Sequence, residues 1–274
     1  MQSLIALFEF EFFRNAILAA FMASITCGII GTYIVSRRIV FISGGITHAS
    51  FGGIGMGYYF GFNPILGAVI FGIFSALGIE LFTKKADLRE DSAIAMLWSL
   101  GMAVGVIFIF LTPGYAPNLM SYLFGNILTV SKEDLLYLLF LSLFIIVFFV
   151  AFYRMIIFVS FDEEFAMTNN APVKLFNALL ISLVALTIVL NIRVVGIILV
   201  MSLLTIPQAI ANLFTKRFDW MMILSIVFGF LGSILGLALS YIYDIPSGAA
   251  IIFTLVILYG VIKISGLVIE KSRQ

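Results

Sequence analysis

The sequence predicts an all-α, polytopic integral membrane protein with about nine transmembrane helices, within a range of eight to ten. Of the 274 residues, 63% are hydrophobic and only 11% are charged, against about 25% charged residues in soluble domains. The mean hydropathy is +1.21. Apolar runs follow one another along nearly the whole chain and leave no room for a soluble domain. We therefore expect a single transmembrane domain over residues 1–274.

The candidate spans are apolar runs of about 18 residues or more, each long enough to cross a hydrocarbon core of about 30 Å as a helix. They cover residues 15–35, 39–60, 62–83, 92–112, 135–152, 173–190, 194–212, 220–241 and 249–266. If successive spans alternate in orientation, most of the 15 lysines and arginines lie on the same side of the membrane as Arg37 and Arg38. The exceptions are Arg14, Lys132 and Arg193. Basic residues are enriched in cytoplasmic loops, so we expect an outside N-terminus and an inside C-terminus.

The middle of the chain leaves one alternative open. The run over residues 119–130 follows two prolines and is too short to span as a helix, so it is interfacial or re-entrant. If it does span, the orientation of the termini changes.

The only histidine, His48, lies in the second span, ten residues after Arg38. At about 1.5 Å per residue the imidazole is roughly 15 Å from the arginine, which is near the midplane of the membrane. A hydrogen-bonded packing role and a role in binding a ligand are both open for this side chain.

Glycines surround the histidine. Small residues recur at every fourth position of this span, at Gly45, Ala49, Gly53, Gly57 and Gly61. Such a stripe lets the backbone of another helix approach closely. Gly44 and Gly52, one turn on either side of His48, leave room beside the ring for a ligand or for an inserted side chain. We expect Gly44, Thr47 and Gly52 to line a pathway at this point.

Two further stretches carry information. The longest predicted inside loop, residues 153–172, contains three consecutive acids from Asp162 to Glu164, and it holds a short helix or is a solvated connection. In the seventh span Pro207 precedes Gln208, and a proline frees a backbone carbonyl at membrane depth. A kinked helix that lines a pathway with Pro207 and Gln208, and a kink that serves packing alone, are both open.

Several function classes are disfavoured by the residues. The sequence has no phosphate-binding loop of the GxxxxGK[ST] type, so ATP hydrolysis by this chain alone is not expected. A membrane enzyme is disfavoured because His48 has no histidine, cysteine or acid within helical reach. The net charge of +1 disfavours nucleic acid as a partner, and Cys27 fits a small packing residue. An ion-coupled secondary transporter remains an alternative, although such proteins usually carry several ionisable residues in their spans.

The chain resembles, nearly end to end, the permease subunits of ABC-type importers for zinc, manganese and iron, the ABC-3 family. The matching stretches are SRRIVFISGGITHASFGGIGMG, EDSAIAMLWSLGMAVGVIFI, NLMSYLFGNILTVSKEDL, FDEEFAMTNNAPV, RVVGIILVMSLLTIPQAIANL and YDIPSGAAII. The resemblance implies a homodimeric, multi-pass permease in the lipid of a bacterial or archaeal plasma (inner) membrane. Cytoplasmic ATPase subunits and an extracytoplasmic metal-binding protein are the implied partners.

The resemblance also implies roles for particular residues. His48 matches a histidine that contacts the passing divalent metal ion, which is a transported substrate and not a permanently bound cofactor. The family aspartate four residues before that histidine is replaced here by Gly44. Residues 153–172 match the cytoplasmic coupling loop that docks on the ATPase. The coupling residues expected there are Asp162, Glu163, Glu164, Ala171 and Pro172. Zinc, manganese and iron all accept imidazole, so the metal stays open, as does a metal chelate.

Overall fold

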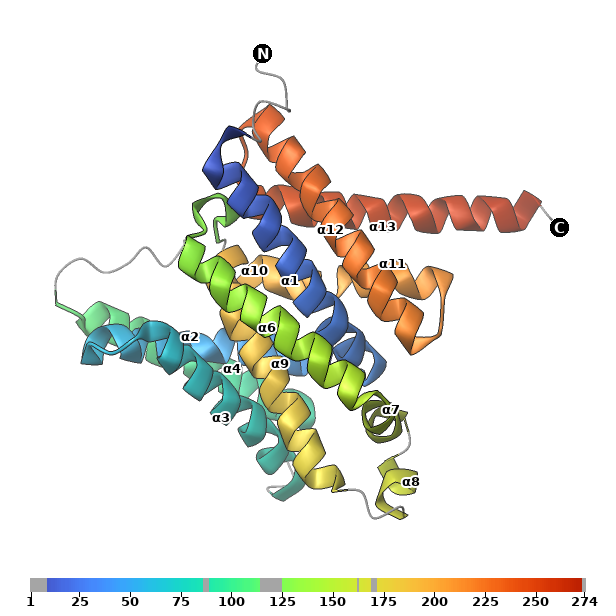
Figure 1. Cartoon of the computed structure of the whole chain (residues 1–274). Coiled ribbons are helices and arrows are strands. Elements are labelled where there is room, and N and C mark those ends of the chain that lie inside the picture. The colour runs from blue at the N-terminus through green and yellow to red at the C-terminus, as the bar shows by residue number, and fades with distance from the viewer. Residues whose placement is uncertain (1–8, 86–88, 114–124, 162, 169–171, 273–274) are drawn as a thin grey trace. The chain divides into compact units, whose positions relative to one another are not determined.

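The computed structural model describes residues 9–85, 89–113, 125–161, 163–168 and 172–272. These ranges contain helices and no strand (Figure 1). The helices are α1 (Glu11–Ser36), α2 (Val40–Phe60), α3 (Pro64–Lys85), α4 (Glu90–Leu111), η2 (Ile127–Thr129), α6 (Lys132–Ala151), α7 (Tyr153–Phe161), α8 (Glu163–Thr168), α9 (Val173–Val195), α10 (Ile197–Leu203), α11 (Ile206–Phe214), α12 (Phe218–Tyr243) and α13 (Ser247–Ser272).

Each of the nine predicted spans coincides with a helix, and α10 together with α11 covers the seventh. In the described residues, seven segments are long and apolar enough to cross a membrane by length and composition. α2 and α3 are not among the seven, although they have 21 and 22 residues. In α2 the glycines and the polar side chains, His48 among them, lower the hydropathy without shortening the helix. The all-α membrane fold is confirmed.

The two segments that the sequence left open have different outcomes. Residues 153–172 contain α7 and α8, two short helices in succession (Figure 1), so of the two alternatives for this loop the short helix is the one present. In the run over residues 119–130, positions 119–124 lie outside the described residues. Positions 125–130 are described and contain the short helix η2. Whether that run spans or re-enters stays a prediction.

The helices form two compact units. One contains α10 to α13, η2, nearly all of α1 and α6 as far as Ile145. The other contains α2, α3, α4, α7, α8, the end of α6 and α9 as far as Arg193. In the first unit α12 packs against α13 and α11, and in the second α2 packs against both α3 and α4.

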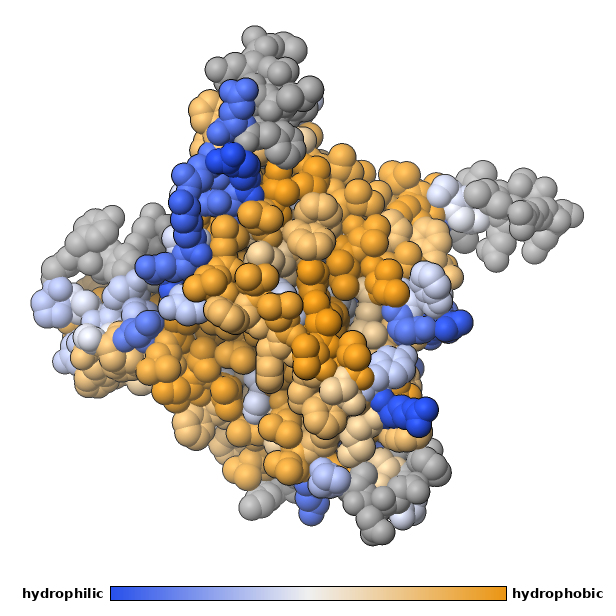
Figure 2. Space-filling model, viewed as in Figure 1, coloured by the Kyte–Doolittle hydropathy of each residue, from blue (hydrophilic) through white to orange (hydrophobic). Residues whose placement is uncertain are grey.

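Large apolar side chains are exposed along the spanning helices. On α6 these are Leu136, Tyr137, Leu139, Phe140, Leu143, Phe144, Ile146, Val147 and Val150. Figure 2 shows hydrophobic residues over most of the face that it presents. Such exposure is costly in water and is the normal state of a helix that faces lipid, where only the backbone hydrogen bonds must be satisfied internally.

The seventh predicted span is broken rather than kinked. α10 ends at Leu203 and α11 begins at Ile206, so Pro207 lies in the first turn of α11, where its missing N–H leaves no hydrogen bond unmade. In a continuous helix the proline ring would clash with the carbonyl of Leu203, four residues earlier. Gln208 donates a 3.2 Å hydrogen bond from Nε2 to that carbonyl. The carbonyl that the proline frees is therefore satisfied by the next side chain.

Two contacts agree with the predicted alternation of the helices across the membrane. Lys132, at the start of α6, lies 2.7 Å from the carboxylate of Glu11 at the start of α1. Arg37, after the end of α1, donates a 2.7 Å hydrogen bond to the carbonyl oxygen of Val159 in α7. Each contact joins residues that the charge pattern places on the same side. Which side faces the cytoplasm stays a prediction from the lysines and arginines.

Candidate functional site

α2 is the most closely packed helix around the predicted site, because its glycines admit the backbones of two neighbours. The predicted small-residue stripe faces α3 at Gly53 and Gly57. A side-chain carbon at Gly53 would collide with the backbone of Gly67, and one at Gly57 would lie 2.5 Å from the Cα of Pro64. The stripe ends at Gly61, which has a φ of 73° and donates its N–H to the carbonyl of Gly57. Glycine adopts that left-handed conformation without steric strain. The predicted close approach is confirmed.

A second glycine contact joins α2 to α4. A side-chain carbon at Gly101 would lie 2.6 Å from the carbonyl oxygen of Ala49, and one at Gly105 would lie 2.7 Å from that of Phe51. Conversely, a Cβ at Gly55 would collide with Gly105. Contacts between bare backbones are typical of membrane helices that associate through small residues. The α2–α4 approach is therefore determined by glycines on both helices.

This approach brings Trp98 of α4 against His48 of α2. The two rings are nearly parallel, with an angle of 8° between their planes and 4.0 Å between their centroids. The Nδ1 atom of His48 is buried and has no hydrogen-bond partner. Ala49 follows His48 directly, and Gly101 lies one turn after Trp98, so the close backbone contact lies beside the stacked pair. Trp98 is thus the aromatic side chain that stacks on the imidazole.

The other pathway residues predicted near His48 are buried in the same unit. The hydroxyl of Thr47 donates a 2.6 Å hydrogen bond to the carbonyl oxygen of Ser43, within α2. Gly52 faces α4 and α3, because a Cβ there would lie 3.0 Å from the carbonyl oxygen of Gly101 and 3.1 Å from the ring of Phe71. Gly44 is buried one turn before the histidine. Helix packing therefore occupies the space at Gly52.

Pro207 and Gln208 belong to the other unit, and the surroundings of Gln208 account for its burial. The side chain is 0% exposed. Besides the bond to Leu203, its Nε2 donates a 2.8 Å hydrogen bond to the carbonyl oxygen of Cys27 in α1. Gly31 leaves the space that the amide fills. The Oε1 atom is buried without a hydrogen-bond partner. Gln208 thus joins α11 to α1 through its amide nitrogen.

The predicted coupling residues are only partly described, since Asp162 and Ala171 lie outside the described residues. Glu163 and Glu164 occupy the first turn of α8, where carboxylates are stabilised by the helix dipole. Glu163 is half-buried and accepts a 2.8 Å hydrogen bond from the amide of Asn177 in α9. Glu164 and Pro172 are exposed. The two acids therefore differ, with Glu163 bound to its own chain and Glu164 open to a partner.

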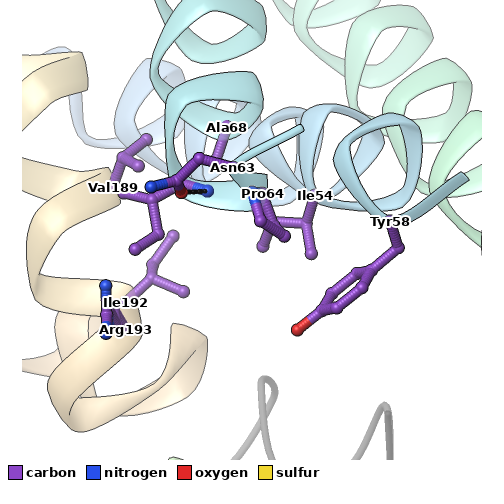
Figure 3. A pocket seen from close by; sticks show the side chains of 9 residues that line it. Ile54, Tyr58, Asn63, Pro64, Ala68, Val189, Ile192 and Arg193 are labelled. Carbon is purple, nitrogen blue, oxygen red and sulfur yellow. Dashed lines mark hydrogen bonds between the residues drawn. The ribbon is translucent and has the colours of Figure 1, made fainter. Parts of the chain in front are cut away.

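A cavity of about 450 Å³ lies within the unit that contains His48 (Figure 3). The end of α2, the start of α3 and the end of α9 form its walls. Most of the lining is aliphatic, with Tyr58, Asn63 and Arg193 as the polar side chains. The Asn63 oxygen is occupied, because it accepts a 2.9 Å hydrogen bond from the backbone N–H of Ile65. Ile54 follows His48 by six residues, about 9 Å along the helix.

In the part of the chain that the structure describes, no group of three or more His, Cys, Asp or Glu side chains is arranged to hold a metal ion. His48 belongs to no such group, and its ring stacks on that of Trp98. Sequence reasoning did not single out Trp98. The sequence feature that could have indicated Trp98 is its position one turn before Gly101, on a face of the fourth span that otherwise carries small residues.

Comparisons with known proteins extend over nearly the whole chain. The model of the ABC 3 transport family matches residues 9–265. An uncharacterized membrane protein of Synechocystis is 41% identical, over 94% of this chain and 92% of its own length. The manganese transport system membrane protein MntC of Halalkalibacterium halodurans is 35% identical, over 90% of this chain and 84% of its own. A chain in the structure of PsaBC from Streptococcus pneumoniae in complex with Fab has a TM-score of 0.86 at 29% identity, covering 94% of this chain and 93% of that one.

Proposed function

The chain belongs to the ABC 3 transport family, and from this membership we propose that it is the permease subunit of an ATP-driven importer of divalent transition-metal ions. The observation that carries the proposal is the family match over residues 9–265, together with a buried, unpartnered His48 Nδ1 in the glycine-rich helix α2. A permease of this kind forms the pathway and leaves ATP hydrolysis to a separate subunit.

Manganese is the proposed first substrate, because a relative of 35% identity carries manganese transport in its name. The donor set is compatible with more than one ion. Imidazole binds zinc, iron and manganese, whereas a site built of carboxylates would favour manganese more strongly. A single imidazole, with Gly44 in place of a carboxylate, predicts weak and transient binding. Weak binding suits transport, because an ion held tightly leaves slowly.

His48 is the proposed donor on the pathway. A divalent ion loses its hydration shell at a large energetic cost when it enters a low-dielectric interior. An imidazole in the second span replaces part of that shell. The cavity beside Tyr58 lies further toward the predicted outer end of α2, on the side from which an extracytoplasmic metal-binding protein would deliver the ion. Thr47, Gly44 and Gly52 are the neighbours along the same helix, and Pro207 with Gln208 are the pathway candidates of the other unit.

Energy coupling is proposed to occur at the segment over residues 153–172, which contains α7 and α8. Glu164 and Pro172 are exposed in this segment, as a docking surface for a cytoplasmic ATPase requires. Asp162 and Ala171 belong to the same proposed surface. The permease is proposed to act as a homodimer in a bacterial plasma (inner) membrane.

Metal uptake into proteoliposomes tests this function. The permease is reconstituted with its ATPase, and uptake of Mn²⁺, Zn²⁺ and Fe²⁺ is measured with ATP and with a non-hydrolysable analogue. We expect metal uptake with ATP and no uptake with the analogue. The ATP-driven uptake should be lost in His48→Ala. It should be retained in Trp220→Phe, which changes an exposed side chain of α12. Uptake driven by an ion gradient without ATP would favour a secondary transporter. Uptake of a metal only with its chelator would favour a permease for metal chelates.

A further inference from the structure

We propose that Trp98 is the positioning residue for His48, and that its indole holds the imidazole in the orientation that binds the transported ion. The inference rests on the proposed function, since it assigns a role beside the same histidine. Its basis is the geometry of the pair, with centroids 4.0 Å apart and planes inclined by only 8°.

A positioning residue is needed because α2 itself does little to hold the ring. The residues one turn before and after His48 are glycines, Gly44 and Gly52, which provide no side chain to pack against it. No hydrogen bond holds Nδ1. A histidine that ligates a metal normally has its ring orientation set by a hydrogen bond from its other nitrogen. The indole of Trp98 lies parallel to the imidazole and covers one face of the ring.

Stacking is compatible with metal binding. An imidazole nitrogen binds a metal in the plane of the ring, about 2 Å away in the case of zinc. An indole on the face of the imidazole leaves that plane free, and it removes one side from which water can approach. Because Gly101 brings α4 against Ala49, the position of the indole depends on the backbone contact between the two helices. The orientation of His48 is therefore supplied by α4.

The chain offers a direct spectroscopic test, since it contains two tryptophans, Trp98 and Trp220. In full-length Trp220→Phe, Trp98 is the only indole that emits. Mn²⁺ is paramagnetic and quenches an indole close to it, so titration with Mn²⁺ should lower the emission in a saturable manner. Mg²⁺, which prefers oxygen ligands, is the matched control ion. Adding His48→Ala should abolish the saturable quenching while Trp98 still emits.

The positioning role is tested by the affinity for Mn²⁺, measured from the free-ion signal in electron paramagnetic resonance, which does not depend on tryptophan. We expect Trp98→Leu to weaken binding roughly two- to tenfold, the range for a lost aromatic pair. Trp98→Phe should restore most of the affinity, because phenylalanine also stacks. Thermal stability of each variant is measured in parallel, and the comparison is made on folded protein.

The outcomes separate the two proposals. Loss of Mn²⁺ binding in His48→Ala with unchanged affinity in folded Trp98→Leu would overturn the role of Trp98 and leave the proposed function standing. Equal affinity in Trp98→Leu and Trp98→Phe would also overturn it, since a stacking role requires them to differ. Saturable Mn²⁺ binding that survives His48→Ala would overturn the role of Trp98 together with that of His48 as the donor, whereas the permease function itself is tested by uptake.

Discussion

Arg37 and Glu163 connect the turn before α2 with the start of α8. The guanidinium of Arg37 lies 3.9 Å from one carboxylate oxygen of Glu163, whose other oxygen accepts the hydrogen bond from Asn177. Arg37 also donates to the carbonyl oxygen of Val159 in α7. The helix that carries His48 is thus tied, through one arginine, to the segment that is proposed to dock on the ATPase.

Arg37→Ala should therefore lower both stability and coupling. The carbonyl of Val159, a buried residue, loses a charged donor, and such a loss costs about 1–3 kcal/mol. We expect a lower unfolding temperature and reduced ATP-driven uptake per folded molecule. Arg38→Ala is the matched control, because Arg38 is the exposed neighbour of Arg37. Equal behaviour of the two variants in both assays would contradict the role given to Arg37.

Charge reversal should have different effects at the two glutamates of α8. Glu163→Lys places a cation beside Arg37 and removes an acceptor from Asn177, so we expect it to lower thermal stability as well as coupling. Glu164→Lys changes an exposed side chain, so we expect normal stability and a weaker stimulation of the ATPase by the permease. The measurements are thermal unfolding and ATP hydrolysis by the reconstituted complex. Full stimulation by Glu164→Lys would remove this residue from the docking surface.

The glycine contact between α2 and α4 should be intolerant of a methyl group. In Gly101→Ala the new carbon meets the backbone of Ala49, and overpacking of this kind costs about 1–3 kcal/mol. Gly78→Ala in α3 is the control, because the nearest side-chain atom to its new carbon is 3.7 Å away, an ordinary contact. Alanine favours a helix interior over glycine by roughly 0.5–1 kcal/mol, so the control should be neutral or stabilised. The stability of both variants is measured as the fraction of protein that stays folded after heating in detergent.

Restoring a carboxylate at position 44 should strengthen metal binding. Residues four apart share a helix face, so the side chain of Gly44→Asp would stand beside His48. We expect a lower Kd for Mn²⁺ and an unfolding temperature that rises with added Mn²⁺, since a ligand that binds only the folded state stabilises it. Transport is expected to slow if release becomes limiting. Gly44→Asn, of equal size without the charge, is the control, and an equal Kd in both variants would count against His48 as a donor.

The predicted orientation can be checked with single cysteines. The native Cys27 is buried, so it should not react with a membrane-impermeant maleimide. Lys132 and Arg217 have side chains that are 79% and 71% exposed, and the ion pair that each forms at the surface contributes little to stability. Lys132→Cys should be labelled in intact cells, and Arg217→Cys only after permeabilisation. The reverse labelling pattern would invert the topology.

The apolar runs determined the class of this protein and the approximate bounds of its helices. A run of about 18 to 20 apolar residues between charges has few alternatives to a spanning helix, because unpaired backbone groups are costly in lipid. The glycine stripe of α2 likewise predicted a close neighbour, since only packing explains small residues at every fourth position. Which helices fill the stripe was not predictable, because spacing along one helix carries no information about its partners.

Tertiary structure decided the details of the site. Trp98 is fifty residues from His48 in the sequence, and the two rings stack only because Gly101 lets α4 reach α2. The proline pattern indicated a kink, whereas the contacts of Gln208 with Leu203 and Cys27 accompany a full break between α10 and α11. The difference between Glu163 and Glu164 likewise depends on Arg37 and Asn177. Local propensity determines where a membrane helix begins and ends, but the surroundings of a side chain follow from contacts between helices that are distant in the sequence.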